Sequence, residues 1–299
     1  MSEIEFQKIT KEDKNIFDNF LRLTQHENSS LNFTNFYMWR KFYNTHWTVK
    51  DNVLYVVLNN RLLQPFCAEE KMDGAIHDAI KIYRDNFSSE YIFHIAEPDF
   101  VERLKNFSGA EFEFFSDRNR ADYVYNAEDL IKLAGRKFHR KKNHLNSFNK
   151  CYPQAEYVSL ETEDAINLCI DCMHDWYNIR DLEQYPALKF ERDAILDLFA
   201  DFKYFGVKGG AILIDGKAEA FAIGEQTTPE MSVVHIEKGD TDFNGIYAAI
   251  NQKFAANEWS EMKYINREED LGIEGIRKTK ESYRPAKMIE KFEVKLKNS

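Results

Sequence analysis

The chain has 299 residues, of which 43% are hydrophobic and 30% are charged, with only 12 Gly and 6 Pro. This length allows two domains of ordinary size, and this composition excludes collagen-like, low-complexity and broadly disordered proteins. The net charge of −10 at pH 7 argues against a protein whose whole surface coats nucleic acid.

The first half of the chain predicts a mixture of strands and helices, from alternating apolar residues and from three- to four-residue spacing. Trp47–Lys50 and Val53–Leu58 flank Asp51-Asn52 and predict a β-hairpin. The other expected strands are Glu3–Ile9, Leu62–Phe66, Tyr91–Ile95 and Glu111–Phe115, and the expected helices are Lys11–Leu23, Asn32–Tyr43, Lys71–Asn86 and Pro98–Asn106. These elements predict a first domain over residues 1–130, which we expect to serve as a scaffold.

A basic segment joins the two halves. Between Leu130 and Ala155 the chain has no Asp or Glu but seven Lys or Arg residues. As a helix, this segment places Phe138, Leu145 and Phe148 on one stripe. We therefore expect a basic linking helix over residues 131–153, which either attracts a phosphate-bearing ligand or forms a solvated helix face.

The second half repeats the order of the first with stronger signals and predicts a second domain over residues 154–299. Asp215-Gly216 has the composition of a two-residue hairpin turn, and Thr162 is a good N-cap. The expected strands are Gln154–Leu160, Val207–Ile214, Ala218–Gly224, Met231–Glu237, Met262–Asn266 and Met288–Leu296, and the expected helices are Thr162–Tyr177, Leu188–Phe202, Asn244–Trp259 and Ile273–Tyr283.

Neither a membrane span nor a secretion signal is predicted. The longest apolar run, Val53–Leu58, has six residues, whereas a transmembrane helix needs roughly 20. The N-terminal residues Met-Ser-Glu-Ile-Glu-Phe carry acids where a signal peptide is basic. We expect a cytoplasmic location, where the four cysteines remain thiols.

The order strand, two helices, hairpin, strand, helix, strand, helix, strand resembles the GNAT superfamily of N-acyltransferases. This resemblance implies an α/β (α+β) fold of tandem GNAT-like domains, each a mixed twisted sheet flanked by helices. It also implies that the strand Met231–Glu237 splays from its neighbour. The acyl donor should then bind near this strand and near Gly245, where a helix begins.

Three motifs carry a closer resemblance, namely Asn32–Arg40, Leu133–Phe148 and Asn266–Pro285. Together they resemble the phosphatidylglycerol lysyltransferase C-terminal domain family over nearly the whole chain. That family is similar to Fem-type peptidyltransferases, and its characterised branch moves an aminoacyl group from a charged tRNA to a lipid head group. The resemblance implies an acyl or aminoacyl transferase with an amine or hydroxyl acceptor.

The donor is left open between aminoacyl-tRNA and acyl-CoA. The segment Glu237–Gly245 lacks the spaced glycines of a pyrophosphate-binding GNAT loop, and Asp240 and Asp242 would repel a pyrophosphate. This favours tRNA, while a CoA-dependent N-acyltransferase and a non-catalytic ligand-binding module on the same scaffold remain the alternatives. No other cofactor is expected.

Three residues are candidates for catalysis, because acyl transfer needs a base, a polarising group and an acid for the leaving group. Glu237 could act as the base, although a solvated strand-end carboxylate is the alternative. Tyr283 resembles the tyrosine that protonates the leaving group in GNAT enzymes, although a core tyrosine is the alternative. Asn266 lies at the strand edge where open α/β sheets usually bind ligands.

The candidates for substrate binding lie in the basic segment and around the end of the chain's penultimate predicted strand. A second basic cluster consists of Arg277, Lys278, Lys280 and Arg284. If it meets the basic segment, the two could bind a tRNA acceptor stem or another phosphate ligand. No metal site is expected, because His139 and His144 are five residues apart and so lie on different helix faces. The binding candidates are Arg136, Lys137, His139, Arg140, Lys141, Asn143, Gly245, Glu269, Asp270, Lys278, Lys280 and Arg284.

Overall fold

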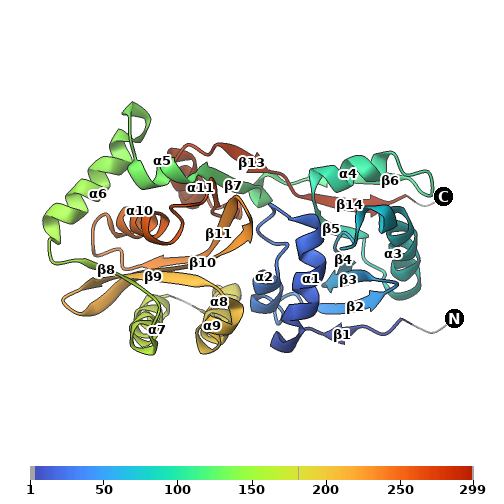
Figure 1. Ribbon diagram of the computed structural model, residues 1–299, viewed down its shortest axis with the longest axis horizontal. Helices are drawn as coiled ribbons and strands as arrows, with labels where there is room; N and C mark the ends of the chain where they lie inside the picture. Colours follow the sequence, from blue (N-terminus) through green and yellow to red (C-terminus); the bar gives the residue numbers. More distant parts are fainter. Residues whose placement is uncertain (1–3, 181, 298–299) are drawn as a thin grey trace. The chain divides into compact units, whose positions relative to one another are not determined.

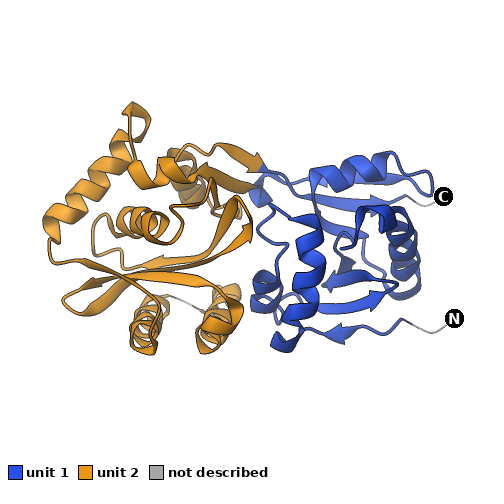
Figure 2. Cartoon of the chain, in the orientation of Figure 1, with its two compact units in different colours: residues 1–121, 289–299 blue, residues 122–288 orange. Residues whose placement is uncertain are grey.

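A computed structural model describes residues 4–180 and 182–297, which form two compact units (Figure 1; Figure 2). Unit 1 consists of the chain up to Ala121 together with the segment from Ile289, and unit 2 runs from Asp122 to Met288. Each unit contains a seven-stranded sheet of described residues. Both sheets are mixed, because each has one parallel pair among antiparallel neighbours in the pairings described.

Unit 1 has the sheet order β1-β2-β3-β4-β5-β14-β6. Its strands are β1 (Gln7–Lys8), β2 (His46–Lys50), β3 (Val53–Leu58), β4 (Arg61–Leu62), β5 (Phe93–Ala96), β6 (Phe112–Ser116) and β14 (Phe292–Leu296). Its helices are α1 (Lys14–Thr24), α2 (Phe33–Met38), α3 (Met72–Asn86) and α4 (Pro98–Lys105). The predicted β2–β3 hairpin is confirmed, with φ values of 53° at Asp51 and 60° at Asn52, as its two-residue turn requires.

The core of unit 1 packs on both faces of its sheet. Ile76 and Ala79 of α3 belong to an apolar cluster with Phe93 of β5. The Phe17 ring of α1 lies 5.2 Å from the ring of Trp47 in β2, in an edge-on arrangement. Because helices cover both faces, every residue of β3 is buried, which explains its continuous apolar run.

Unit 2 has the sheet order β13-β7-β12-β11-β10-β9-β8. Its strands are β7 (Asp122–Asn126), β8 (Glu156–Ser159), β9 (Lys208–Ile214), β10 (Lys217–Thr228), β11 (Met231–Gly239), β12 (Tyr264–Asn266) and β13 (Lys287–Ile289). Its helices are α5 (Ala127–Lys132), α6 (His139–Cys151), α7 (Glu163–Asn178), α8 (Pro186–Ala200), α9 (Phe202–Phe205), α10 (Ile246–Glu258) and α11 (Glu274–Ser282).

In unit 2, α10 packs on one face of the sheet with α5 and α6 beside it, while α7 packs on β10 from the other face (Figure 1). Two local predictions are confirmed. Thr162 caps α7, since its hydroxyl accepts a hydrogen bond of 3.2 Å from the Ala165 amide, and Asp215 and Gly216 have φ values of 51° and 81°. The predicted order of elements is also present, and the expected mixed α/β class, with two mixed sheets each flanked by helices, is confirmed.

The sheet of unit 2 opens at the end of β11. Within the described residues, the parallel pairing between β11 and β12 covers Met231 to Val233 only, although β11 continues to Gly239. The register with β10 shifts between Ile223 and Gly224, which leaves His235 as an extra residue in β11. The expected splay is therefore present, and Glu237 lies on the separated part of the strand.

The structure divides the chain differently from the expected boundaries at 130 and 154. The predicted closing strand of the second domain, β14, instead pairs with β5 and β6 in unit 1, where Val294 lies opposite Phe93 and Phe114. In the other direction, β7, which was not predicted, pairs with β12 in unit 2. Strand patterns in the sequence reveal that a strand forms, but not which edge it joins.

The expected linking helix over residues 131–153 is two helices that belong to unit 2. Helix α5 ends where Leu133 adopts a φ of 44°, and Gly135 follows with a φ of 83°. These left-handed conformations end one helix before α6 begins. The predicted apolar stripe is present, because Phe138 and Phe148 are fully buried and Leu145 packs against the same cluster.

Candidate functional site

A cavity of about 220 Å³ lies at the N-terminus of α10 in unit 2. We call it the α10 cavity. Its walls include Lys141 and His144 of α6, Gly245 and Tyr247 at the start of α10, and Tyr283 at the end of α11. Three residues selected from separate sequence motifs, Lys141, Gly245 and Tyr283, therefore line one cavity.

Gly245 lets α6 lie directly against the start of α10. Its φ is 90°, which favours glycine. A Cβ atom at this position would lie 2.7 Å from the His144 carbonyl oxygen and 3.1 Å from the Phe148 Cβ. The glycine thus brings the basic helix α6 to the end of α10 where backbone N–H groups and the helix dipole favour negative charge.

An ion pair between Glu237 and Arg267 is buried beside this cavity. Arg267 Nη2 lies 2.9 Å from Glu237 Oε1 and 3.2 Å from Oε2, and Asn251 Nδ2 donates to Oε2 at 3.3 Å. Arg267 is 9% exposed and Asn251 3% exposed. Within the described residues, the buried atoms Arg267 Nη1 and Asn251 Oδ1 have no hydrogen-bond partner.

Tyr283 and Lys141 connect the ion pair to the cavity. The Arg267 guanidinium lies 4.9 Å from the centre of the Tyr283 ring, and Lys141 Nζ lies 4.3 Å from it. Burial raises the pKa of Tyr283 to about 12, because it disfavours the phenolate. The hydroxyl therefore stays protonated at neutral pH and can donate a hydrogen bond or a proton.

Burial lowers the pKa of the neighbouring Lys141 amine. Desolvation, together with the positive charges of Arg267 and Arg140, lowers the pKa of Lys141 to about 8, although the charge of Glu237 opposes the shift. The cavity thus holds an amine that is partly neutral near pH 8 and a tyrosine that remains protonated.

Asn266 lies in the core rather than at the cavity. It is fully buried, its Nδ2 donates to Asp122 Oδ2 at 3.0 Å, and its Oδ1 accepts from the Glu268 amide at 2.8 Å. These bonds join the end of β12 to the start of β7. This arrangement suits a residue that orients the loop carrying Arg267.

Two other predicted binding residues also support this loop. Asp270 is fully buried and accepts hydrogen bonds from Arg277 Nε at 2.7 Å and from the Tyr123 hydroxyl at 2.5 Å. Lys280 Nζ donates to the carbonyls of Arg267, Glu268 and Glu269. The Lys280 ammonium and the Arg277 guanidinium are thus bonded to the loop that follows β12.

Of the remaining predicted binding residues, Glu269 is half-buried and the others are exposed. His139 and Asn143 lie 3.5 Å apart on α6, at the limit of a hydrogen bond. Lys137 pairs with Asp129 and Lys278 pairs with Glu274. Arg136, Arg140 and Arg284 are exposed, and Arg136 and Arg140 form no ion pair with a carboxylate in the described part of the chain.

Lys141 of α6 contacts the ring of Tyr283, which precedes Arg284 in the chain. Neither Arg267 nor Asn251 was among the residues predicted for the site. Asn251 does leave a signal, since it is a buried amide among the apolar residues of α10. Arg267 lies within a quoted motif, but its pairing with Glu237 depends on how the sheet splays.

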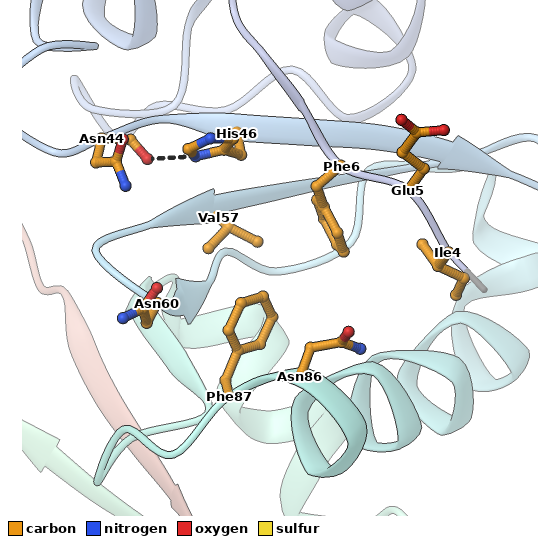
Figure 3. A pocket seen from close by; sticks show the side chains of 9 residues that line it. All are labelled: Ile4, Glu5, Phe6, Asn44, His46, Val57, Asn60, Asn86 and Phe87. Carbon is orange, nitrogen blue, oxygen red and sulfur yellow. Dashed lines mark hydrogen bonds between the residues drawn. The ribbon is translucent and has the colours of Figure 1, made fainter.

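A larger, open cavity of about 620 Å³ lies in unit 1 (Figure 3). Phe6, Val57 and Phe87 form its apolar part, and His46 Nδ1 hydrogen-bonds the Asn44 carbonyl oxygen at 2.8 Å. Glu5 is the one charged residue in this lining, so the cavity lacks the convergent cations and buried polar groups of the α10 cavity. We assign the candidate site to unit 2.

No group of three or more His, Cys, Asp or Glu side chains in 4–180 and 182–297 is placed to hold a metal ion. None of the helices in the same ranges has the length and apolar character needed to cross a membrane.

Comparison with known proteins identifies the family. The family model described as phosphatidylglycerol lysyltransferase, C-terminal, matches residues 21–295. A conserved protein of unknown function from Bacteroides thetaiotaomicron is 32% identical, with a TM-score of 0.88 over 99% of this chain and 100% of that chain.

More distant relatives share the fold. L-PGS from Bacillus licheniformis is 14% identical, with a TM-score of 0.68 over 100% of this chain and 95% of that one. An uncharacterised protein from Mycoplasmoides gallisepticum is 24% identical over 216 residues, which cover 71% of this chain and 67% of the relative. Because the family model spans nearly the whole sequence, the predicted resemblance is confirmed, and the chain belongs to the phosphatidylglycerol lysyltransferase C-terminal family.

Proposed function

We propose that this protein is an aminoacyltransferase that moves an aminoacyl group from aminoacyl-tRNA to an amine or hydroxyl acceptor at the α10 cavity. The family to which the chain belongs is named for the transfer of a lysyl group. The observation that carries the proposal is that Lys141 of the basic helix α6 and Tyr283 line one cavity, while Arg267 of the buried Glu237–Arg267 pair lies 4.9 Å from the centre of the Tyr283 ring.

The side chains at the cavity match the needs of acyl transfer. In this reaction, the acceptor forms a bond to the ester carbonyl carbon, the ester C–O bond breaks, and the leaving oxygen takes a proton. Tyr283 is a protonated hydroxyl at the cavity wall, so it can supply that proton. Arg267 Nη1 is a donor that can stabilise developing negative charge on the carbonyl oxygen.

Two features favour tRNA over CoA as the donor. In the loop before α10, Asp240 Oδ1 accepts a hydrogen bond of 2.9 Å from the Asp242 amide, so a carboxylate occupies an amide that a pyrophosphate would need. By contrast, Arg136, Arg140 and Lys142 are exposed on or next to α6. Exposed cations without acidic partners suit the phosphate backbone of an RNA.

The test compares binding of aminoacyl-tRNA to the wild-type protein and to a triple variant, Arg136→Gln, Arg140→Gln and Lys142→Gln, at several salt concentrations. A matched control removes the same charge from exposed residues elsewhere, with Lys8→Gln, Arg84→Gln and Lys203→Gln. We expect the α6 variant to bind more weakly and to reduce the salt slope by about three, while the control binds like the wild type.

Other outcomes would redirect the assignment. Equal losses in both triple variants would show that the RNA has no specific site on α6. Thermal stabilisation by acyl-CoA but not by aminoacyl-tRNA would identify a CoA-dependent N-acyltransferase. Binding of charged tRNA without any transfer to a panel of amine and hydroxyl acceptors would favour the binding module.

A further inference from the structure

Lys141 is an amine in the α10 cavity that no carboxylate neutralises. Its Nζ lies 4.3 Å from the centre of the Tyr283 ring, and its side chain is half-buried. Within the described residues it forms no ion pair with Asp or Glu. Other lysines of the same basic segment have different surroundings. Lys132 forms an ion pair with Glu128, Lys137 forms one with Asp129, and Lys150 is exposed.

Glu237, the base expected from the sequence, is already engaged. Both of its carboxylate oxygens accept hydrogen bonds from Arg267, and one also accepts from Asn251. These bonds hold the carboxylate against Arg267 and Asn251, and Glu237 does not line the α10 cavity. The neutral form of Lys141, in contrast, offers a free lone pair to the cavity.

We infer that Lys141 is the general base that takes the proton from the attacking acceptor, and that Glu237 is a positioning residue that holds Arg267. This inference rests on the proposed aminoacyl transfer and names a further catalytic residue for it. Lys141 approaches the cavity from α6, so the basic helix contributes to the chemistry as well as to RNA binding.

The charged and titratable groups around Lys141 come from every element that meets there. Arg140 and His144 are on α6, Glu237 is on β11, and Arg267 follows β12. Tyr247 of α10 and Tyr283 at the end of α11 complete the surroundings. Desolvation and the two arginines lower the pKa of Lys141 to about 8, which makes a neutral amine available at mildly alkaline pH.

The proton balance needs no further reactant. As the acceptor N or O bonds to the carbonyl carbon, its proton moves to the neutral Nζ of Lys141. The ester C–O bond breaks, and the Tyr283 hydroxyl gives its proton to the leaving oxygen. The proton on Lys141 then passes to the Tyr283 oxygen, which restores both groups for the next cycle.

The first test needs no substrate. The amines of the native protein are labelled briefly with acetic anhydride across pH 6 to 11, and each lysine is followed by mass spectrometry. We expect Lys141 to react with a midpoint near pH 8, whereas a lysine in a model peptide has a pKa of about 10.4. A midpoint for Lys141 equal to that of a model-peptide lysine would overturn the inference.

The second test uses aminoacyl transfer. Lys141→Arg keeps a positive charge but cannot act as a base near neutral pH, so we expect a loss of about 10²-fold or more in single-turnover rate with unchanged binding of aminoacyl-tRNA. Lys150→Arg is the control and should react at the wild-type rate. The wild-type rate should rise through pH 8, and this rise should persist in Glu237→Gln.

The outcomes separate the two proposals. If the wild-type protein transfers nothing while Lys141 titrates near pH 8, the proposed function fails at this site. If the wild-type protein transfers and Lys141→Arg keeps both the rate and the pH profile, the assignment of the base to Lys141 is wrong. Loss of the rise in Glu237→Gln would return the role of base to Glu237.

Discussion

Arg267 donates from one nitrogen, Nη2, to both carboxylate oxygens of Glu237, at 2.9 and 3.2 Å. Glu237 lies on the part of β11 that has separated from β12, and Arg267 directly follows β12. The pair therefore joins the two strands beyond their last backbone pairing. This connection leaves room for a ligand while it keeps the separated strands in place.

Removing one member of this pair should destabilise unit 2. In Glu237→Leu, the buried guanidinium of Arg267 loses its counter-charge, and we expect the free energy of unfolding to fall by about 3–5 kcal/mol. In the double variant Glu237→Leu/Arg267→Met no charge is left unpaired, so much of this loss should be recovered. Urea unfolding of the three proteins measures both effects. A double variant as unstable as the single one would contradict the argument.

His235 should make stability depend on pH above neutrality. Burial opposes its protonation, but hydrogen bonds with Glu225 and Glu268 at 3.0 and 3.1 Å dominate and raise the pKa of His235 to about 9. Because the folded pKa exceeds the unfolded value of about 6.5, the contribution is complete below pH 6.5 and is lost as pH rises through 9.

We expect the unfolding free energy of the wild-type protein to decrease by up to about 3 kcal/mol between pH 6 and pH 10 because of this histidine. His235→Gln should be less stable at pH 6 and should lack this decrease. Urea unfolding at a series of pH values, together with NMR titration of the His235 ring, makes the comparison. The same slope in both proteins would show that His235 does not titrate in this range.

A methyl group at Gly245 should separate α6 from α10. Gly245→Ala places a Cβ 2.7 Å from the His144 carbonyl oxygen and demands a φ of 90°, so we expect a loss of about 1–3 kcal/mol. Gly275→Ala is the matched control, because it lies in α11 with no atom within 4 Å of the added Cβ. The control should be neutral or stabilising by up to about 1 kcal/mol, as thermal unfolding can determine.

The Tyr283 hydroxyl should matter for turnover more than for folding. No hydrogen bond holds this hydroxyl within the described residues, so Tyr283→Phe should unfold like the wild type while its single-turnover rate falls about 10²-fold or more. Tyr125→Phe provides the contrast, since the Tyr125 hydroxyl donates to the Lys280 carbonyl at 2.8 Å. That variant should lose about 1 kcal/mol of stability. An unimpaired rate in Tyr283→Phe would remove this residue from the mechanism.

Local chemistry in the sequence predicted most individual elements of this fold. The turns at Asp51-Asn52 and Asp215-Gly216 and the cap at Thr162 depend only on neighbouring residues, so they could be read directly. The edge at which a strand pairs depends on the whole sheet. For this reason the strand containing Val294 was expected in the second domain, although it completes the sheet of unit 1.

The sequence also predicted some residues of the candidate site but not the way in which they are paired. Lys141, Gly245 and Tyr283 lie in recognisable motifs, and the structure places all three around one cavity. The engagement of Glu237 by Arg267 could not be predicted, because it depends on the direction in which two strands separate. A sequence motif likewise could not distinguish Asn266, which is bonded inside the core, from a residue that faces the cavity.

The position of β14 also determines when each unit can complete its structure during translation. Unit 2 is continuous from Asp122 to Met288, so its segment is synthesised after the first part of unit 1 and before β14. Unit 1 needs a strand from Phe292 to Leu296 between β5 and β6, and this strand follows the whole of unit 2 along the chain. The nascent first unit therefore carries two unpaired inner strand edges while unit 2 is being synthesised, and such edges favour aggregation.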